Sequence, residues 1–73
     1  MSDINKKICN YIAFNWVALS KSNRAFATEH NIDEKTVRKI TSPSGYRIPV
    51  VTLEKICESR EIKISDFFKL INM

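Results

Sequence analysis

The sequence SNRAFATEHNIDEKTVRKI, residues 22–40, holds two short helical patterns separated by a polar break. Ser22 is a good N-cap for a helix that ends near His30, because its side-chain oxygen can accept from a free backbone N–H. Asn31 follows, and asparagine tolerates the left-handed backbone conformation that ends a helix and reverses the chain. Asp33 is a good N-cap for the next helix. This stretch therefore predicts two short helices joined by a tight turn.

The second of these helices should reach Thr41, and its inner and outer faces differ in chemistry. Apolar residues from both helices form one inner face: Phe26, Ala27, Ile32, Val37 and Ile40. Among them, Ala27 is small at the point where the two helices must cross closely. The outer positions of the second helix are all charged: Glu34, Lys35, Arg38 and Lys39. Two short helices joined by a tight turn, the second with a polar outer face, form a helix-turn-helix.

Further helices are predicted on either side of this pair, the first where apolar residues recur at helical spacing from Ile4 to about Leu19. The single glycine and both prolines lie within residues 43–49, which predicts a loop. A helix is expected after this loop, around Leu53, Ile56 and Cys57. Ser65 is the predicted N-cap of a last helix that carries Phe67, Phe68, Leu70 and Ile71. The expected fold is all-α, with five short helices in one domain over residues 1–73.

The size and composition of the chain limit the classes of function. A chain of 73 residues, 44% of them hydrophobic and 27% charged, has room for one folded domain. It leaves no space for a deep cleft with supporting residues around it, which argues against an enzyme. The sequence also lacks a Ser/His/Asp set, a metal-ligand pattern and a phosphate-binding loop, and His30 stands alone. We therefore expect a protein that is not an enzyme, without a metal, a cofactor or an evident small-molecule ligand.

The two cysteines, Cys9 and Cys57, lie far apart in the sequence and outside any metal-binding spacing. Both fall on predicted helix faces, so they are expected to be reduced and buried rather than joined in a disulfide. The sequence shows no signal peptide and no apolar run long enough to span a bilayer. The expectation is a cytoplasmic protein that does not engage a membrane.

The formal net charge of +4 is unevenly placed along the chain. Residues 21–47 carry six basic and three acidic side chains, whereas residues 48–73 carry four of each. Phosphate backbones attract a basic patch of this kind through counterion release. Lys and Arg on a helix can also donate to guanine O6 and N7 in the major groove. The alternative is a solvated basic face that serves solubility, and charge alone does not decide between the two.

Three segments taken together resemble the phage Cro- and repressor-type helix-turn-helix family, also called the xenobiotic-response-element family. They are NRAFATEHNIDEKTVRKI at residues 23–40, GYRIPVVTLEKICE at residues 45–58, and IKISDFF at residues 62–68. The resemblance covers most of the chain and depends on the order and spacing of these pieces. It implies a compact five-helix, lambda-repressor-like bundle that binds an operator in double-stranded DNA. It also implies a symmetric homodimer and a role as a repressor-like transcriptional regulator.

The resemblance assigns DNA contacts to residues of the two central helices and the loop that follows. Glu34, Lys35 and Lys39 fall where the family reads bases, and Arg38 falls at the rim of the same helix. Asn23 falls where the family contacts a phosphate at the start of the preceding helix, and the loop residues approach the DNA backbone. The complete predicted DNA-binding set is Asn23, Arg24, Glu34, Lys35, Arg38, Lys39, Tyr46 and Arg47.

The chain departs from the family pattern at three places. Asn31 stands in the turn where the family usually has Gly, and Thr41 stands where Glu is frequent. Arg60 and Glu61 replace the usual Leu-Gly before the last helix. Because Arg60 occupies an apolar position of the pattern, a thinner core is expected there.

The sequence leaves three alternatives open. Glu34 can stabilise the N-terminus of its helix or accept a hydrogen bond from cytosine N4. Phe67 and Phe68 can both belong to the core, both belong to a dimer surface, or divide between the two, although adjacent helix residues cannot both point fully inward. The apolar run to which they belong predicts a dimer through the C-terminal part. The same fold can also serve as a protein-binding module, such as an antitoxin or an adaptor. DNA binding should weaken steeply with salt, which separates the two functions.

Overall fold

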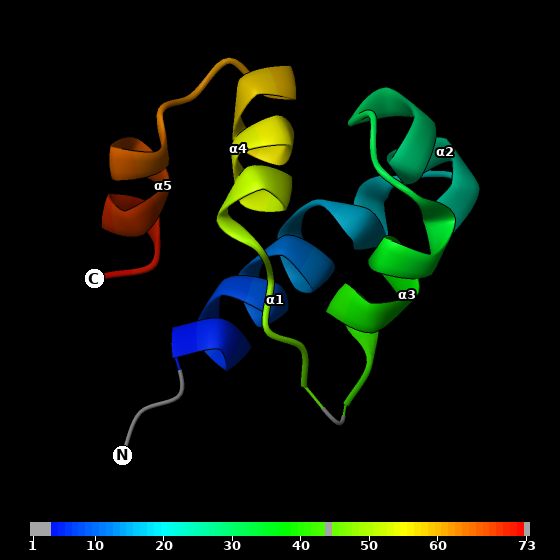
Figure 1. The fold of residues 1–73 in the computed structure, drawn as a ribbon, viewed down its shortest axis with the longest axis horizontal. Helices are drawn as coiled ribbons and strands as arrows, with labels where there is room; N and C mark the ends of the chain where they lie inside the picture. The colour runs from blue at the N-terminus through cyan, green and yellow to red at the C-terminus, as the bar shows by residue number, and fades with distance from the viewer. Residues whose placement is uncertain (1–3, 44, 73) are drawn as a thin grey trace.

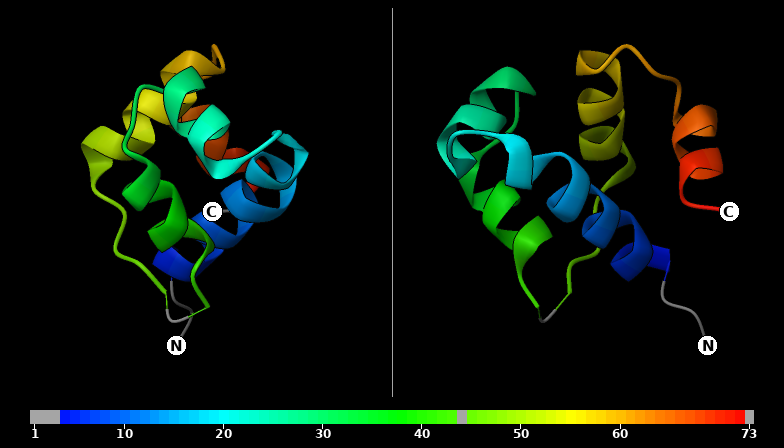
Figure 2. Two further views of the ribbon diagram at one scale, coloured as in Figure 1. Left: turned by 90° about the vertical axis from the view of Figure 1, so that its right-hand side faces the viewer. Right: turned by 180° about the vertical axis from the view of Figure 1, so that it is seen from behind.

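The computed structural model describes residues 4–43 and 45–72, and over these residues the fold is all-α, as the sequence predicts. It contains five α-helices, one 3-10 turn and, within these ranges, no strand. The elements are α1 (Ile4–Asn15), η1 (Val17–Leu19), α2 (Asn23–Glu29), α3 (Glu34–Thr41), α4 (Val50–Ser59) and α5 (Ile64–Leu70). Helices α2 and α3 lie on one side of the molecule, α5 lies on the other, and α4 lies between them (Figure 1). Helix α1 crosses the back of this arrangement and packs against α3 (Figure 2).

The first helix is shorter than its apolar pattern predicts. It ends at Asn15, and the chain then tightens into η1. The Asn15 side-chain amide donates to the Tyr11 carbonyl at 3.0 Å and so competes with the helical backbone bond to the same oxygen. Such 3-10 turns are a frequent way for an α-helix to end. The predicted continuous helix to Leu19 is therefore wrong over its last turn.

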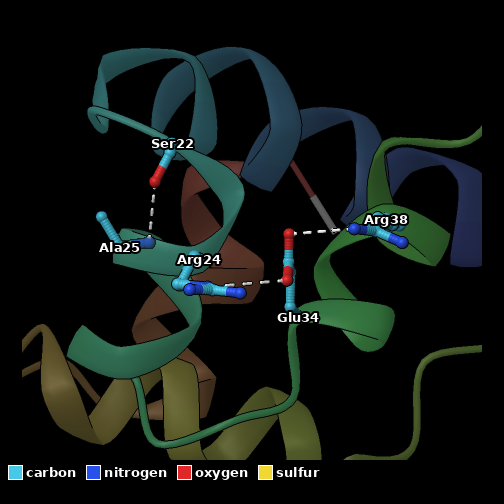
Figure 3. A network of polar contacts seen from close by, with 5 residues as sticks. All are labelled: Ser22, Arg24, Ala25, Glu34 and Arg38. Atoms are coloured by element: carbon cyan, nitrogen blue, oxygen red, sulfur yellow. Dashed lines mark hydrogen bonds and ion pairs between the residues drawn. The ribbon is translucent and has the colours of Figure 1, made fainter.

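The caps of the two central helices confirm one local prediction and correct another. The Ser22 hydroxyl accepts from the Ala25 backbone N–H at 3.0 Å (Figure 3), so Ser22 caps α2 as expected. Asp33 stands at the N-cap position of α3, but its side chain makes no capping hydrogen bond. Its carboxylate is exposed, and α3 begins with the Val37 N–H donating to the Asp33 carbonyl at 3.2 Å. Water can hydrogen-bond to the exposed Asp33 carboxylate in place of the helix N–H groups. The only Asp33 contact that starts α3 is therefore the backbone hydrogen bond.

Helices α2 and α4 end in the same way, through one residue in the left-handed conformation. Asn31 has a φ of 57° and Glu61 a φ of 59°. After each of them, an isoleucine N–H closes the helix end: Ile32 donates to the Ala27 carbonyl at 2.9 Å, and Ile62 donates to the Cys57 carbonyl at 3.0 Å. The reversal at Asn31 was expected from sequence, and the same reversal occurs at Glu61 without a residue that favours it.

The start of α5 differs from the prediction. The helix begins at Ile64 with Lys63 at the N-cap position, and Ser65 lies inside the first turn. The Phe67 N–H donates to the Lys63 carbonyl at 3.0 Å, so the backbone rather than a serine side chain starts this helix. The register follows from the turn at Glu61 and from the need to direct Phe67 into the core.

We expect the substitution Glu61→Gly to stabilise the fold by about 0.5–1 kcal/mol. A residue with a side chain loses about 1–2 kcal/mol in the left-handed conformation, and the larger entropy of glycine in the unfolded chain offsets part of the gain. The control is Glu58→Gly in the exposed part of α4, which should lower stability by about 0.5–1 kcal/mol. Urea unfolding followed by circular dichroism measures both changes. Destabilisation by both substitutions would contradict the strain assigned to Glu61.

The hydrophobic core confirms most of the predicted inner face. Four of the five inner-face residues of the central helix pair are buried, and so are Leu53 and Ile56 of the helix after the loop: Phe26, Ala27, Val37 and Ile40 are the four. Ile32 is only half-buried against this core, because it lies in the turn directly after Asn31. Cys9 and Cys57 are free and buried, as expected. Burial raises the pKa of the Cys57 thiol above its usual value, so this residue acts as a small apolar core side chain.

The C-terminal aromatics resolve into one core residue and one half-buried residue. Phe67 is fully buried, and its ring centroid lies 5.7 Å from that of Tyr11 and 5.5 Å from that of Trp16. Phe68 is half-buried at 5.9 Å from Phe67, in an edge-to-face arrangement. Phe67 therefore belongs to the core, one of the alternatives that the sequence leaves open. Of that run, Leu70 is the residue left exposed.

Arg60 makes two contacts in the region where a thinner core is expected. Its guanidinium lies over the Trp16 ring, 4.4 Å from the centroid, and its Nη1 lies 3.3 Å from His30 Nε2. The buried His30 ring stacks on Phe26, with centroids 3.8 Å apart, and its Nδ1 lies 2.8 Å from the Phe26 carbonyl. Because a carbonyl only accepts, Nδ1 carries the hydrogen, and Nε2 can accept from Arg60. Arg60 thus joins the end of α2 to Trp16.

Candidate nucleic-acid interface

The exposed face of α3 is the best candidate for a functional surface. Val37 and Ile40 anchor the helix in the core, and α3 packs against both α2 and α1. On the opposite side of the helix, three basic side chains are exposed: Lys35, Arg38 and Lys39. Lys35 and Lys39 are four residues apart and so lie one above the other on the same face. The core therefore holds a short cationic helix face in a fixed position at the edge of the molecule (Figure 1).

Glu34, the first residue of α3, lies between two arginines (Figure 3). Its Oε2 accepts from Arg38 Nη2 at 3.1 Å, one turn along the same helix. Its Oε1 lies 3.9 Å from Nε of Arg24, which belongs to α2. The side chain of Glu34 is 33% exposed, compared with 84% for Arg24 and 65% for Arg38. The carboxylate thus links the two helices of the helix-turn-helix at their outer surface.

The loop after α3 carries the next part of the basic surface. The Tyr46 ring lies beneath Lys39, with the ammonium 5.7 Å from the ring centroid. The Tyr46 carbonyl accepts from the Cys9 thiol at 3.5 Å, and Ile48 is buried in the core. Arg47 lies between these two anchored residues and is exposed. The backbone on either side of Arg47 is therefore held, while its side chain is left to solvent.

The structure brings the residues predicted from sequence into two groups and leaves three outside them. Arg24, Glu34 and Arg38 form one group, and Lys39 and Tyr46 form the other. Lys35 and Arg47 are exposed and form no ion pair with any residue in the ranges 4–43 and 45–72. Asn23 is half-buried at the start of α2.

Sequence reasoning foresaw these side chains but not how they pair. The spacing of four residues between Glu34 and Arg38 is a signal for their contact. No sequence signal indicates the contact of Arg24 with Glu34, because it depends on how α2 and α3 cross.

The surface of the described residues also has hollows, and these lie away from the basic side chains of α3. One hollow, of about 590 Å³, lies between α1 and the end of α3 and has a mainly apolar lining that includes Cys9, Ala13, Phe14 and Val17. A more polar groove of about 420 Å³ lies beside His30 and Arg60. Over the described residues, no cluster of three His, Cys, Asp or Glu side chains is placed to hold a metal ion. The helices in those ranges are also too short or too polar to cross a membrane.

Comparison of the chain with models of known protein families, with curated proteins and with solved structures finds no match.

Proposed function

We propose that this protein binds double-stranded DNA in a sequence-specific manner and acts as a repressor-like transcriptional regulator at an operator. The observation that carries the proposal is the charge and position of one surface. Helices α2 and α3, which the core holds in place, and the loop after α3 carry five basic residues and one carboxylate. They are Arg24, Lys35, Arg38, Lys39, Arg47 and Glu34. A cationic helix of this kind fits the major groove, where Lys and Arg can donate to base edges.

The proposed docking gives each side chain a different task. Helix α3 enters the groove with its N-terminus first, so Glu34 and Lys35 lie deepest and Lys39 lies one turn behind. Arg38 lies at the rim of the groove. Tyr46 supports the Lys39 ammonium from below, since the two are already in contact. Asn23, Arg24 and Arg47 are proposed to meet backbone phosphates, which fix the register of the helix without reading sequence.

An unbiased selection of bound duplexes from a random pool tests this proposal directly. Sequence-specific binding should enrich one short motif over successive rounds. Enrichment of duplexes without a common motif would reduce the proposal to non-specific DNA binding.

We expect Arg47→Ala to weaken binding to all duplexes by about the same factor. A phosphate contact contributes affinity through counterion release and carries no sequence information, so its removal should make the negative slope of log K against log salt less steep by about one. The control is Lys63→Ala, which removes an equal charge at the exposed N-cap position of α5, on the far side of the molecule (Figure 1) and at the opposite end of that helix from Leu70. Anisotropy titrations at several salt concentrations measure both slopes. Equal effects of the two substitutions would remove Arg47 from the interface.

We also propose that the protein forms a twofold homodimer through its C-terminal part, where Leu70 is exposed beside the half-buried Ile71. A dimer should bind a pseudo-palindrome with half-sites about 10 base pairs apart, one turn of DNA. Sedimentation equilibrium should show a dimer that Leu70→Lys weakens. A monomer at high micromolar concentration, with a selected motif that has no twofold symmetry, would contradict this proposal.

A protein-binding module, such as an antitoxin or an adaptor, is a second candidate that one observation favours. Phe14 and Leu19 are 74% and 82% exposed, and Phe14 lines the apolar hollow beside α1. Exposed apolar groups of this size favour contact with another protein. The substitutions Phe14→Ser and Leu19→Ser should leave DNA binding unchanged if the DNA interface lies on α3.

A further inference from the structure

The two oxygens of the Glu34 carboxylate serve different arginines, and the two contacts are unequal. The contact to Arg38 is a hydrogen bond of 3.1 Å within α3. The contact to Arg24 spans 3.9 Å, beyond hydrogen-bond distance, and reaches across to α2. Arg24 is also the more exposed of the two arginines, at 84%. Exposed ion pairs contribute little to stability, so Arg24 can leave Glu34 and bind a phosphate that approaches α2 with little loss of free energy.

The departure of Arg24 would change what Glu34 can bind. Oε1 would lose its cationic neighbour, while Oε2 would keep its hydrogen bond to Arg38. A carboxylate oxygen only accepts hydrogen bonds, so at the leading end of α3 it needs a donor on the DNA. The N4 amino group of cytosine supplies one in the major groove. Guanine O6 and N7 are acceptors and would repel the carboxylate.

We propose that Glu34 determines base specificity by giving up its contact with Arg24 and forming a contact with a DNA base instead. Arg24 passes to a backbone phosphate, and Glu34 Oε1 then accepts from the amino group of a cytosine. The proposal rests on the DNA binding proposed above. The proposal couples the contact of Glu34 with cytosine to the contact of Arg24 with a phosphate. On a duplex that lacks the cytosine, Glu34 Oε1 has no donor on the DNA. Glu34 then keeps its contact with Arg24, and the contact of Arg24 with the phosphate is weaker.

The test compares four variants on two duplexes. Glu34→Gln, Arg24→Ala and the double variant form a cycle, and Asp33→Asn is the matched control. The exposed Asp33 carries the same charge one residue away and is in no ion pair within residues 4–43 and 45–72. Fluorescence anisotropy measures affinity for the duplex enriched by selection and for a scrambled duplex of the same composition. Circular dichroism of each variant verifies the fold.

The proposal predicts opposite effects of Glu34→Gln on the two duplexes. Affinity for the scrambled duplex should rise roughly two- to fivefold, the range expected when an exposed ion pair no longer restrains Arg24. Affinity for the selected duplex should fall by about fivefold, because the neutral amide oxygen of glutamine accepts from the cytosine amino group more weakly than the carboxylate does. In the Arg24→Ala protein, the gain on the scrambled duplex should shrink to that of Asp33→Asn. The control should shift both duplexes by one common factor.

The outcomes separate this proposal from the function on which it rests. Equal gains from Glu34→Gln with and without Arg24 would show that Glu34 acts through its charge alone, and would overturn the exchange. An unchanged preference at every base pair would remove Glu34 from base readout and would also overturn it. Failure of the parent protein to bind either duplex in a salt-dependent manner would instead reject the proposed function, and this inference with it.

Discussion

The substitution Phe26→Ala should lower the free energy of unfolding by about 3–5 kcal/mol, the range measured when a buried aromatic ring is replaced by alanine. Phe26 is fully buried in α2, and the buried His30 ring stacks on it at 3.8 Å. The substitution therefore removes core volume and the stacking partner of a buried polar ring. The total stability of a chain of this length is only about 4–11 kcal/mol. The variant should thus lose a large part of its stability or fail to fold.

Urea unfolding, followed by circular dichroism and by the fluorescence of Trp16, measures the decrease in stability. The matched control is Phe14→Ala, which removes the same ring from α1 at a position that is 74% exposed. The control should change stability by less than about 0.5 kcal/mol, as is usual for surface substitutions. A small effect at Phe26, or equal effects at both positions, would contradict the core described above.

The second large effect is expected at Lys35, the basic residue proposed to lie deepest in the groove. Lys35→Ala should cost about 1–3 kcal/mol of binding free energy on the selected duplex and relax the preference at one base pair. Binding to a scrambled duplex should change much less. Lys35 is exposed and forms no ion pair over the described ranges, so the variant should retain its fold.

Titration of Lys35→Ala and Arg47→Ala on the same two duplexes checks this assignment, because base readout and phosphate binding respond differently to the DNA sequence. Removing a side chain that reads a base weakens binding to the selected duplex most, whereas removing one that binds a phosphate weakens binding to both duplexes. An equal decrease in affinity on both duplexes for Lys35→Ala would place Lys35 on the backbone.

Local signals explain why the central helix pair was predictable from sequence. The hydroxyl of Ser22 and the left-handed tolerance of Asn31 act on neighbouring backbone, so the residue types alone identify the cap and the turn. The apolar spacing of Val37 and Ile40 likewise identifies which face of α3 is buried and which is exposed.

The features that sequence did not predict depend on tertiary contacts. The register of α5 follows from the turn at Glu61 and the burial of Phe67, rather than from Ser65. Arg60 is exposed, but its guanidinium lies over the ring of Trp16, a residue of a distant segment, in the region where a thinner core is expected. The contact of Arg24 with Glu34 also depends on tertiary structure, because it forms only when α2 and α3 pack against each other.

The salt dependence of DNA binding by the parent protein tests the central claim most directly. Each neutralised phosphate should contribute about −0.9 to the slope of log K against log salt. The proposed contacts of Arg24 and Arg47 therefore predict a slope of about −2 or steeper per protomer, with the selected duplex bound more tightly than a scrambled one at every salt concentration. Binding that does not change with salt, or no binding of either duplex, would contradict the claim and favour a protein-binding module.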